Sequence, residues 1–255
     1  MGVCELFSLK GKKALVTGGT RGLGFAVAEA FAECGADVAI MGRKKDTVMK
    51  AAGLIGSRYA ARVIGLTGDV SVQADVKAAV RDVLDAFGTL DIAFNNAGVS
   101  GGDEVMDITG DELDRIMDTN VKGVLYCCQE EARVMLAKGS GSIINMASMS
   151  ASIINIPVHI AHYCASKAAV KSLTKGMAVE WAEKGVRVNS ISPGFFDTEM
   201  NRKREDLYDT FRSMIPMRRI ASPEELKGIL VYLASDASSY MTGSDIIIDG
   251  GYTCV

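Results

Sequence analysis

Short apolar runs alternate with amphipathic stretches along the whole chain. Runs typical of buried strands lie at 14–16, 37–41, 62–66, 90–94, 142–146, 186–191 and 245–248. Between them, apolar residues recur at helical spacing over 22–35, 45–57, 72–87, 111–138, 158–184 and 223–234. Strands that alternate with helices pair in parallel through right-handed crossovers, and helices then cover both faces of the sheet. The pattern predicts one three-layer α/β/α domain over residues 1–255, with a doubly wound parallel sheet of seven strands.

Capping residues mark the start of three predicted helices. They are Ser71, the Thr109-x-x-Glu112 box and the Ser222-Pro223-x-Glu225 box. In a doubly wound sheet, ligands bind beyond the carboxyl ends of the strands. We therefore expect the chemistry of this protein in the loops that follow the strands.

Composition narrows the classes of protein to which the chain can belong. There are 28 Lys and Arg against 31 Asp and Glu, a net charge of -3, so no overall basic field would attract a nucleic acid backbone. With 48% hydrophobic and 23% charged residues, the chain is unlike a disordered one. No apolar run approaches the roughly 18 residues that cross a bilayer, and the first residues lack the apolar core of a signal peptide. We expect a cytoplasmic protein that binds neither nucleic acid nor membrane.

The six cysteines form no C-x-x-C pair, and no histidine stands at metal-ligand spacing from them. A chain of 255 residues needs no disulfide bonds to hold its core. The sequence therefore predicts reduced thiols and no metal site.

A glycine-rich turn follows the first predicted strand. Glycines at a strand-to-helix turn let the backbone approach a pyrophosphate, which then lies against free N–H groups at the positive end of the helix. The alternative is a simple tight turn, but the strand, the turn and the following helix together favour a dinucleotide site. The cofactor contacts expected from this turn are Gly18, Thr20, Arg21, Gly22, Leu23 and Gly24.

The residues after the second strand indicate which dinucleotide binds. NAD sites usually have Asp or Glu here to bond the ribose 2′-OH, whereas this chain has Gly42 followed by Arg43, Lys44 and Lys45. Together with Arg21, these cations suit a 2′-phosphate. The alternative for the two lysines is that they are only the solvated start of a helix. We expect NADP(H) rather than NAD(H), bound through Arg21, Arg43 and Lys44.

A tyrosine and a lysine stand four residues apart in the helix after the fifth strand. This spacing puts Tyr163 and Lys167 on one helix face, about 6 Å apart along the axis. Tyrosine ionises near pH 10, and a nearby ammonium lowers that pKa enough for proton exchange with an alcohol or carbonyl. Such a pair is commonly just a half-buried ring beside a surface charge. Here the fifth strand ends at Ser148, whose hydroxyl could hold a substrate oxygen, and this favours a catalytic site.

Taken in order, these motifs resemble those of the short-chain dehydrogenase/reductase family over essentially the whole chain. The matches are T-G-x-x-x-G-x-G at 17–24, N-N-A-G at 95–98, Asn120, Ser148, Y-x-x-x-K at Tyr163 and Lys167, and P-G-x-x-x-T at 193–198. The resemblance implies a Rossmann fold and hydride transfer between a nicotinamide cofactor and a carbonyl or secondary alcohol. It also implies a homotetramer, or a homodimer, assembled through the two longest helices.

The same resemblance implies a role for each matched residue. Tyr163 would be the general acid and base, and Ser148 would orient the reacting oxygen. Lys167 would lower the pKa of Tyr163 and hold the nicotinamide ribose, while Asn120 would position a water in a proton relay. Further cofactor contacts are implied for Asp69, Val70, Asn96, Ala97, Gly98, Ile191, Pro193, Gly194, Phe196 and Thr198.

The segment between Ser148 and Tyr163 suggests a substrate class. Ser148-Met149-Ser150 and the following Ile154-Asn155-x-Pro157 resemble the sugar and polyol reductases of the family, such as mannitol 2-dehydrogenases and sorbose reductases. Against a fully polar sugar stand four apolar side chains of the same segment: Ile153, Ile154, Ile156 and Val158. His159 and His162 are expected to line the pocket or cap a helix, and residues 195–221 to form a substrate lid.

Two other functions stay open at this point. Reduction of a 3-oxoacyl group on an acyl carrier protein would need a basic docking patch beside the lid. Residues able to form one are Arg202, Lys203, Arg204, Arg218 and Arg219. A regulatory protein that senses dinucleotides without catalysis is the alternative from another class, although a sensor has no use for a phenolate at Tyr163.

Overall fold

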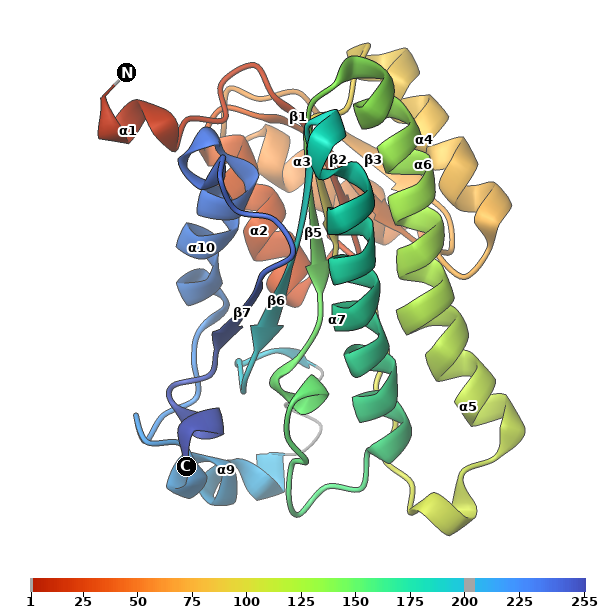
Figure 1. The fold of residues 1–255 in the computed structure, drawn as a ribbon, viewed down its shortest axis with the longest axis vertical. Coiled ribbons are helices and arrows are strands. Elements are labelled where there is room, and N and C mark those ends of the chain that lie inside the picture. The colour runs from red at the N-terminus through yellow and green to blue at the C-terminus, as the bar shows by residue number, and fades with distance from the viewer. Residues whose placement is uncertain (1, 200–204) are drawn as a thin grey trace.

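A seven-stranded parallel sheet forms the centre of the molecule (Figure 1). The computed structural model describes residues 2–199 and 205–255. The strands are β1 (Lys13–Thr17), β2 (Asp37–Gly42), β3 (Val63–Thr67), β4 (Ile92–Asn95), β5 (Gly141–Met146), β6 (Val186–Pro193) and β7 (Asp245–Ile248). Their order is β3-β2-β1-β4-β5-β6-β7, so the direction of winding reverses between β3 and β4. The predicted doubly wound sheet is confirmed.

Helices cover both faces of the sheet, because successive side chains of each strand point to opposite faces. One layer holds α2 (Gly22–Glu33), α3 (Lys45–Gly56) and α10 (Lys227–Ala234), and the other holds α4 (Gln73–Phe87), α6 (Gly123–Lys138) and α7 (Ala161–Trp181). The first layer packs on fully buried side chains such as Val16, Ile40 and Phe94. The second packs on Leu15, Met41 and their neighbours. The sheet is therefore buried on both sides.

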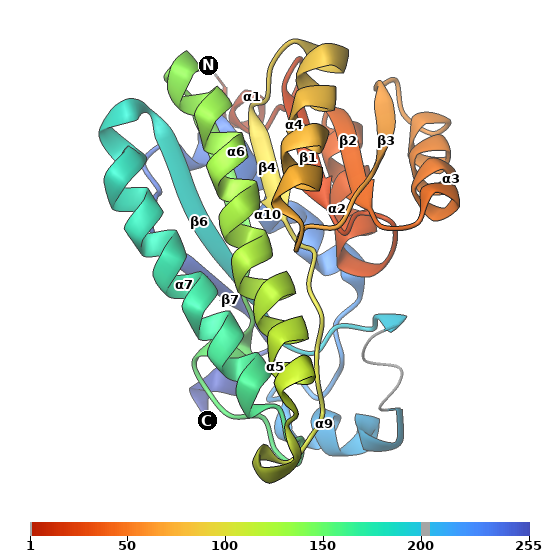
Figure 2. The same cartoon turned by 90° about the vertical axis from the view of Figure 1, so that its right-hand side faces the viewer.

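Shorter elements complete the chain. They are α1 (Val3–Leu6), α5 (Gly110–Met117), α9 (Tyr208–Met214), a π-helical turn η2 (Asp118–Lys122), and the 3-10 turns η1 (Val105–Asp107), η3 (Met149–Ala151), η4 (Ala182–Lys184), η5 (Glu205–Leu207), η6 (Pro223–Leu226), η7 (Asp236–Ser238) and η8 (Tyr252–Cys254). Figure 2 shows α5 and α6 as one long rod beside α7, with the π turn between them. The helix predicted over 111–138 is thus interrupted at residues 118–122.

Some predicted boundaries are wrong for physical reasons. The helix expected over 158–184 begins only at Ala161, because Val158 and Ile160 line a cavity and their apolar spacing reflects that. Ser71 does not cap α4, since its hydroxyl donates to Asp69 Oδ1 at 2.8 Å and Val72 takes the capping position. The Thr109 cap forms.

The capping box at Ser222 forms in full, over a 3-10 turn that leads into α10. The Ser222 hydroxyl accepts from Glu224 N at 3.2 Å, and the Glu225 carboxylate accepts from Ser222 N at 2.9 Å. The predicted start of this helix is confirmed, although its first four residues are not α-helical.

A buried polar cluster lies between β4, β5 and α6. Asn95 Nδ2 donates to Glu131 Oε2 at 2.9 Å and to Asn145 Oδ1 at 3.1 Å. Asn145 Nδ2 in turn donates to Thr174 Oγ1 at 3.0 Å. Glu131 is fully buried, and loss of hydration raises the pKa of its carboxyl group to about 8. In the folded protein at neutral pH, Glu131 is therefore mostly the uncharged acid.

We expect Glu131→Gln to change how stability depends on pH. An unfolded Glu ionises near pH 4.5, whereas Glu131 in the folded protein keeps its proton up to about pH 8. The contribution of Glu131 to wild-type stability therefore falls as the pH rises between these values. Glutamine has no proton to lose. The free energy of unfolding of the variant, relative to wild type, should therefore rise by about 3 kcal/mol from about pH 5 to pH 8.

Urea unfolding across this pH range measures the difference, with Glu183→Gln as the control because Glu183 is exposed. The control should track wild type at every pH. Parallel stability curves for Glu131→Gln and wild type would contradict a neutral carboxyl in the core.

Candidate active site

A cavity of about 560 Å³ opens at the carboxyl ends of the central strands. It is large enough for a dinucleotide's reactive end and a small substrate. Of the predicted cofactor contacts it is lined by Gly18, Thr20, Arg21, Gly22, Leu23, Gly24, Arg43, Asp69, Val70, Asn96, Ala97, Gly98, Pro193, Gly194, Phe196 and Thr198. Ser148, Tyr163 and Lys167 line the same cavity. Ile191, by contrast, is fully buried and is not part of the lining.

The glycine turn between β1 and α2 is packed too tightly for side chains. Gly18 has φ of +64°, and a Cβ there would lie 2.8 Å from Asn96 Nδ2. At Gly24 a Cβ would lie 2.4 Å from both Asn96 Nδ2 and the Gly18 carbonyl oxygen. The backbone of the turn is therefore bare where it faces the cavity, at the N-terminus of α2.

Asn96 fastens this turn from the neighbouring strand. Its Nδ2 donates to the carbonyl oxygens of Thr17 at 3.0 Å and Gly18 at 3.1 Å. Ala97 N donates to Thr17 Oγ1 at 3.2 Å. The loop after β4 thus holds the glycine turn in shape, a role for Asn96 that the sequence did not reveal.

The cations predicted to select NADP(H) differ in their placement. Arg43 lines the cavity at the end of β2 with a largely exposed side chain, and its guanidinium lies 3.9 Å from Asp69 Oδ2. Arg21 lines the cavity too but donates to Glu199 Oε2 at 2.6 Å. Lys44 is the exposed N-cap of α3 and is not part of the lining, so its predicted contact is not supported.

A side chain at Gly42 would crowd its neighbours. A Cβ at this position would lie 2.9 Å from Thr20 Cγ2 and 3.0 Å from Val48 Cγ2. This is where an NAD site usually has an acidic residue. Crowding as well as charge thus disfavours a carboxylate here.

Lys167 is almost fully buried beside Tyr163 on α7. Its Nζ donates to the Met146 carbonyl oxygen at 2.8 Å, which ties the helix to the end of β5, and lies 5.8 Å from the centroid of the Tyr163 ring. Loss of hydration lowers the pKa of Lys167 to about 8. The predicted Tyr/Lys juxtaposition is present, and the lysine is a buried charge rather than a surface one.

Ser148 begins a chain of buried hydroxyl and amide groups. Its Oγ donates to Ser150 Oγ at 3.1 Å, and Ser150 Oγ donates to Asn155 Oδ1 at 2.5 Å. All three side chains are buried and line the cavity. In the sequence, Ser150 and Asn155 stand out only through the resemblance to sugar and polyol reductases. The fold makes them part of the site.

Asn120 lies in the π turn and is fully buried, outside the cavity lining. Its Oδ1 accepts from Val99 N at 2.8 Å, and its Nδ2 donates to Val99 O at 2.9 Å and to Ser166 Oγ at 3.0 Å. The side chain therefore fastens the loop after β4 to α7, one turn from Tyr163. Its relay role stays a prediction.

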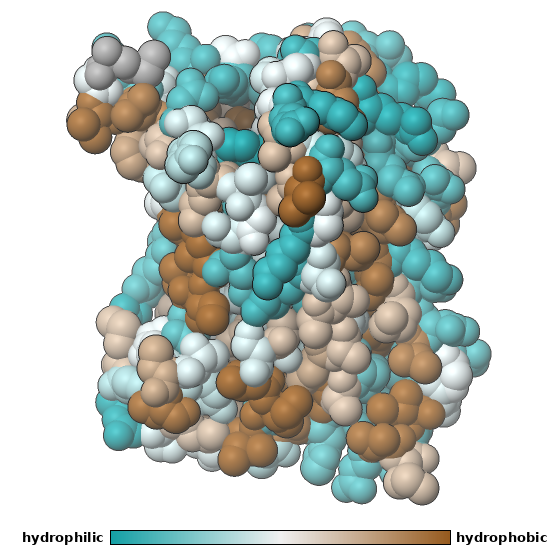
Figure 3. All heavy atoms as spheres, in the orientation of Figure 1, coloured by the Kyte–Doolittle hydropathy of each residue, from teal (hydrophilic) through white to brown (hydrophobic). Residues whose placement is uncertain are grey.

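The apolar residues that argued against a sugar were expected to face the cavity, but most of them do not. Ile154 and Ile156 are 67% and 62% exposed, and of the four apolar residues only Val158 belongs to the lining. Hydrophobic side chains gather toward the end of the molecule where α9 lies (Figure 3). The objection to a polar substrate is therefore mostly removed.

The predicted lid is described in part. Phe195, Phe196 and Thr198 line the cavity, and the Phe195 ring stacks on Phe211 of α9 with centroids 4.1 Å apart. Met200, Arg202, Lys203 and Arg204 lie outside the described residues. Arg219 is bonded through both terminal nitrogens to Glu225, which reduces its availability for a carrier protein.

The cysteines are arranged as free thiols rather than as disulfide pairs. All six are unpaired, and burial raises the pKa of Cys127, Cys128 and Cys164, so these thiols are unreactive. Cys4 and Cys254 are exposed. Among the described residues, no helix combines the length and the apolar character that a membrane crossing requires.

Comparison with known proteins extends this picture. A family model described as Enoyl-(Acyl carrier protein) reductase matches residues 18–253. The chain is 44% identical to a sorbose reductase of Candida albicans, over 99% of this chain and 90% of that protein. It is 41% identical to a probable NADP-dependent mannitol dehydrogenase of Yarrowia lipolytica, over 99% of this chain and 91% of that protein.

A solved structure agrees with these relatives. The crystal structure of a short-chain type dehydrogenase/reductase from Mycobacterium marinum superposes with a TM-score of 0.97 at 46% identity, covering 100% of both chains. The sheet order, the glycine turn and the Ser148, Tyr163 and Lys167 arrangement fit the same assignment. The chain belongs to the short-chain dehydrogenase/reductase family.

Proposed function

We propose that this protein is an NADP(H)-dependent oxidoreductase that interconverts a ketose and the corresponding polyol. The observation that carries the proposal is the buried Lys167 ammonium beside Tyr163, in one cavity with Ser148 and the glycine turn. An ammonium kept out of water next to a phenol serves proton transfer, and the other groups in the cavity suit a cofactor and an oxygen-bearing substrate.

The cavity fits a dinucleotide cofactor. The bare glycine turn and the N-terminus of α2 would hold the pyrophosphate, Arg43 the 2′-phosphate, and Lys167 the nicotinamide ribose. Asp69 and Val70 would lie by the adenine, and Thr198 by the nicotinamide. When bound, the nicotinamide supplies or accepts the hydride.

The chain's own residues handle the proton. In the reduction direction Tyr163 donates its phenolic proton to the substrate oxygen, and in oxidation it takes that proton back. The Lys167 ammonium stabilises the phenolate, and the Ser148 hydroxyl turns away from Ser150 to donate to the reacting oxygen. Asn120, whose side chain is held between Val99 and Ser166, would position the water of the proton relay as the family resemblance implies.

The polar side of the cavity supports a polyhydroxylated substrate. Ser148, Ser150 and Asn155 present buried donors and acceptors, and Arg115 adds a guanidinium. Polar groups in a site discriminate strongly for substrates that bond them. The relatives named sorbose reductase and NADP-dependent mannitol dehydrogenase support the same substrate class and cofactor.

We also infer the assembly and the compartment. The long rod of α5 and α6 lies beside α7 on one side of the molecule (Figure 2), and Val179 on α7 is 81% exposed. This face suits contacts between copies, in a homotetramer or homodimer. The unpaired thiols fit the reducing cytoplasm.

Steady-state NADPH oxidation over a panel of carbonyl compounds tests the proposed function. The panel holds fructose, sorbose, 5-ketogluconate, an acetoacetyl thioester and an aromatic diketone, each repeated with NADH. We expect turnover of a ketose, with NADPH preferred. Turnover of the thioester alone would instead indicate reduction of a 3-oxoacyl group on an acyl carrier protein. NADPH binding without turnover of any compound would favour a regulatory protein that senses dinucleotides.

Tyr163→Phe should lower kcat by about 10³-fold and leave NADPH affinity within about twofold of wild type, because the hydroxyl acts on the proton. Turnover is measured on the best substrate of the panel, and NADPH affinity by fluorescence titration. Tyr240→Phe is the matched control, since Tyr240 is fully exposed. A parallel loss of NADPH binding and turnover in Tyr163→Phe would contradict the assigned role.

Arg43→Ala should raise the Kd for NADPH by about tenfold or more and change that for NADH by less than about twofold, since it removes a charge-assisted bond to the 2′-phosphate. Lys44→Ala is the matched control, because Lys44 carries the same charge outside the cavity lining. Equal weakening of both cofactors by Arg43→Ala, or equal effects of the two variants, would refute the contact.

A further inference from the structure

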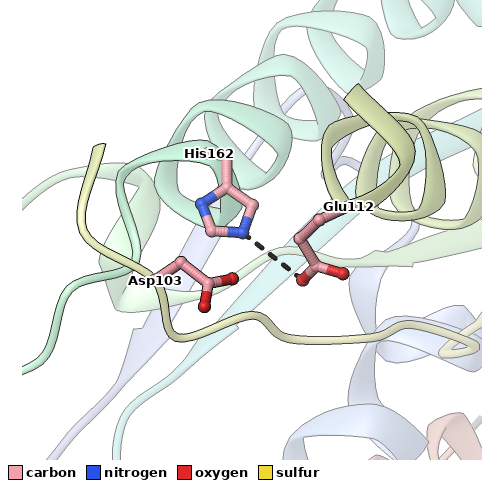
Figure 4. Close-up of side chains that lie close together, drawn as sticks. All are labelled: Asp103, Glu112 and His162. Carbon is pink, nitrogen blue, oxygen red and sulfur yellow. Dashed lines mark ion pairs between the residues drawn. The ribbon is translucent and has the colours of Figure 1, made fainter. Parts of the chain in front are cut away.

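Three side chains from two parts of the sequence, about residues 103–112 and residue 162, meet beside the active site (Figure 4). Asp103 comes from the loop between β4 and η1, Glu112 from the first turn of α5, and His162 from the first turn of α7. One potential ligand atom from each lies within 4.8 Å of the other two. His162 directly precedes Tyr163, so this cluster borders the catalytic residues without including them.

His162 is the unusual member of the cluster. Its side chain is 2% exposed, and neither ring nitrogen has a hydrogen-bond partner among the described residues. Nε2 points toward Glu112 Oε1, 3.6 Å away, as the dashed line in Figure 4 marks. A buried imidazole without a partner loses the hydration of both nitrogens. A ligand between Nε2 and the carboxylates would compensate for that loss.

The charges around the cluster leave one carboxylate that is not neutralised by a neighbouring cation. Arg115 donates to Glu112 through Nε and a terminal nitrogen, both at 2.7 Å, and so neutralises one carboxylate. The Asp103 carboxylate remains available to a cation, since it is exposed and makes no ion pair among the described residues. Glu112 Oε1 keeps a second lone pair for the side that faces His162.

The Gly101 backbone packs closely against the two inner ligands. A Cβ at this position would lie 2.2 Å from His162 Nε2 and 2.7 Å from Glu112 Oε1. A side chain at this position would therefore displace the His162 and Glu112 side chains. The loop after β4 thus brings bare backbone to the point where the two ligands converge.

We propose that Asp103, Glu112 and His162 bind a divalent transition-metal ion of the Zn²⁺ type. Imidazole nitrogen with two carboxylates suits Zn²⁺, whereas Mg²⁺ and Ca²⁺ take oxygen ligands. Two ligands about 2.1 Å from a tetrahedral zinc lie about 3.4 Å apart, close to the 3.6 Å between Nε2 and Oε1. Asp103, on its exposed loop, closes the remaining distance, and water takes the fourth position.

Such an ion would join the loop after β4 to α5 and α7. Ser100 and Gly101 of this loop line the cavity, and Arg115 already donates to the Ser100 carbonyl oxygen at 2.9 Å. The metal would therefore stiffen the part of the wall that carries these residues and hold the first turn of α7 in place. Its role is structural, since none of the three ligands belongs to the cavity lining.

Zn²⁺ titration in competition with a chromogenic chelator tests the proposal, on untagged protein freed of metal. We expect one equivalent bound per chain. His162→Gln should remove it, and Asp103→Asn should weaken it by about tenfold or more. His159→Gln and Glu104→Gln are matched controls, because both residues are exposed neighbours with the same chemistry, and they should bind as wild type does.

Two further readouts separate a metal site from a merely structural cluster. Zn²⁺ should raise the Tm of wild type but not of His162→Gln, and Co²⁺ should give a tetrahedral absorption spectrum that Gly101→Ala abolishes. Asp103→Asn should fold as wild type does, since it changes only an exposed side chain, so its loss of Zn²⁺ affinity would not reflect misfolding. Equal Zn²⁺ binding by wild type and His162→Gln, or the absence of binding by wild type up to about millimolar Zn²⁺, would overturn the proposal.

Discussion

Parallel pairing in register places one row of polar side chains across the sheet, and the active site depends on that row. Thr17, Asn95, Asn145, Ser190 and Asp245 are successive partners in four strand pairs. Asn95 donates to Asn145, and the Ser190 hydroxyl donates to Asp245 at 2.6 Å. In β1, β4 and β5 the row stands at or next to the last residue of the strand, so the chain there soon enters the loops that line the cavity, whereas Asp245 is the first residue of β7. A shift of one residue would turn the row to the opposite face, so register and site are specified together.

The site has a cost in stability that comes from Lys167. An ammonium held at a pKa of about 8 instead of 10.5 costs the folded state about 3 kcal/mol at neutral pH. Between about pH 8 and 10.5 the folded protein has lost this proton and the unfolded chain still holds it, so this contribution makes stability rise with pH. The Met146 carbonyl offsets only part of the lost hydration. The burial of Lys167 therefore limits the stability of the region where α7 meets the end of β5.

Local patterns in the sequence sufficed for the strands, the glycine turn and the Tyr163 and Lys167 pair, because each lies within one continuous element. Features made by the approach of separate elements could not be predicted. Asn96 closes on the glycine turn from another strand, and His162 meets its acidic neighbours only after folding. The exposure of Ile154 shows the opposite error, since apolar character in a loop does not tell which way a side chain points. The π turn at Asn120 has no sequence signal in a helix of otherwise regular spacing.

The crowding at Gly42 has a consequence for how cofactor preference can change over generations. An acidic residue introduced there would push against Thr20 and Val48, so its first effect would be strain rather than a new bond to a ribose. Thr20 belongs to the glycine turn itself, and relieving the strain would alter the pyrophosphate cradle. A side chain at position 42 would therefore be accommodated most easily together with changes at Thr20 in the turn and Val48 in α3. Substitutions at these positions should therefore combine non-additively in their effect on cofactor preference.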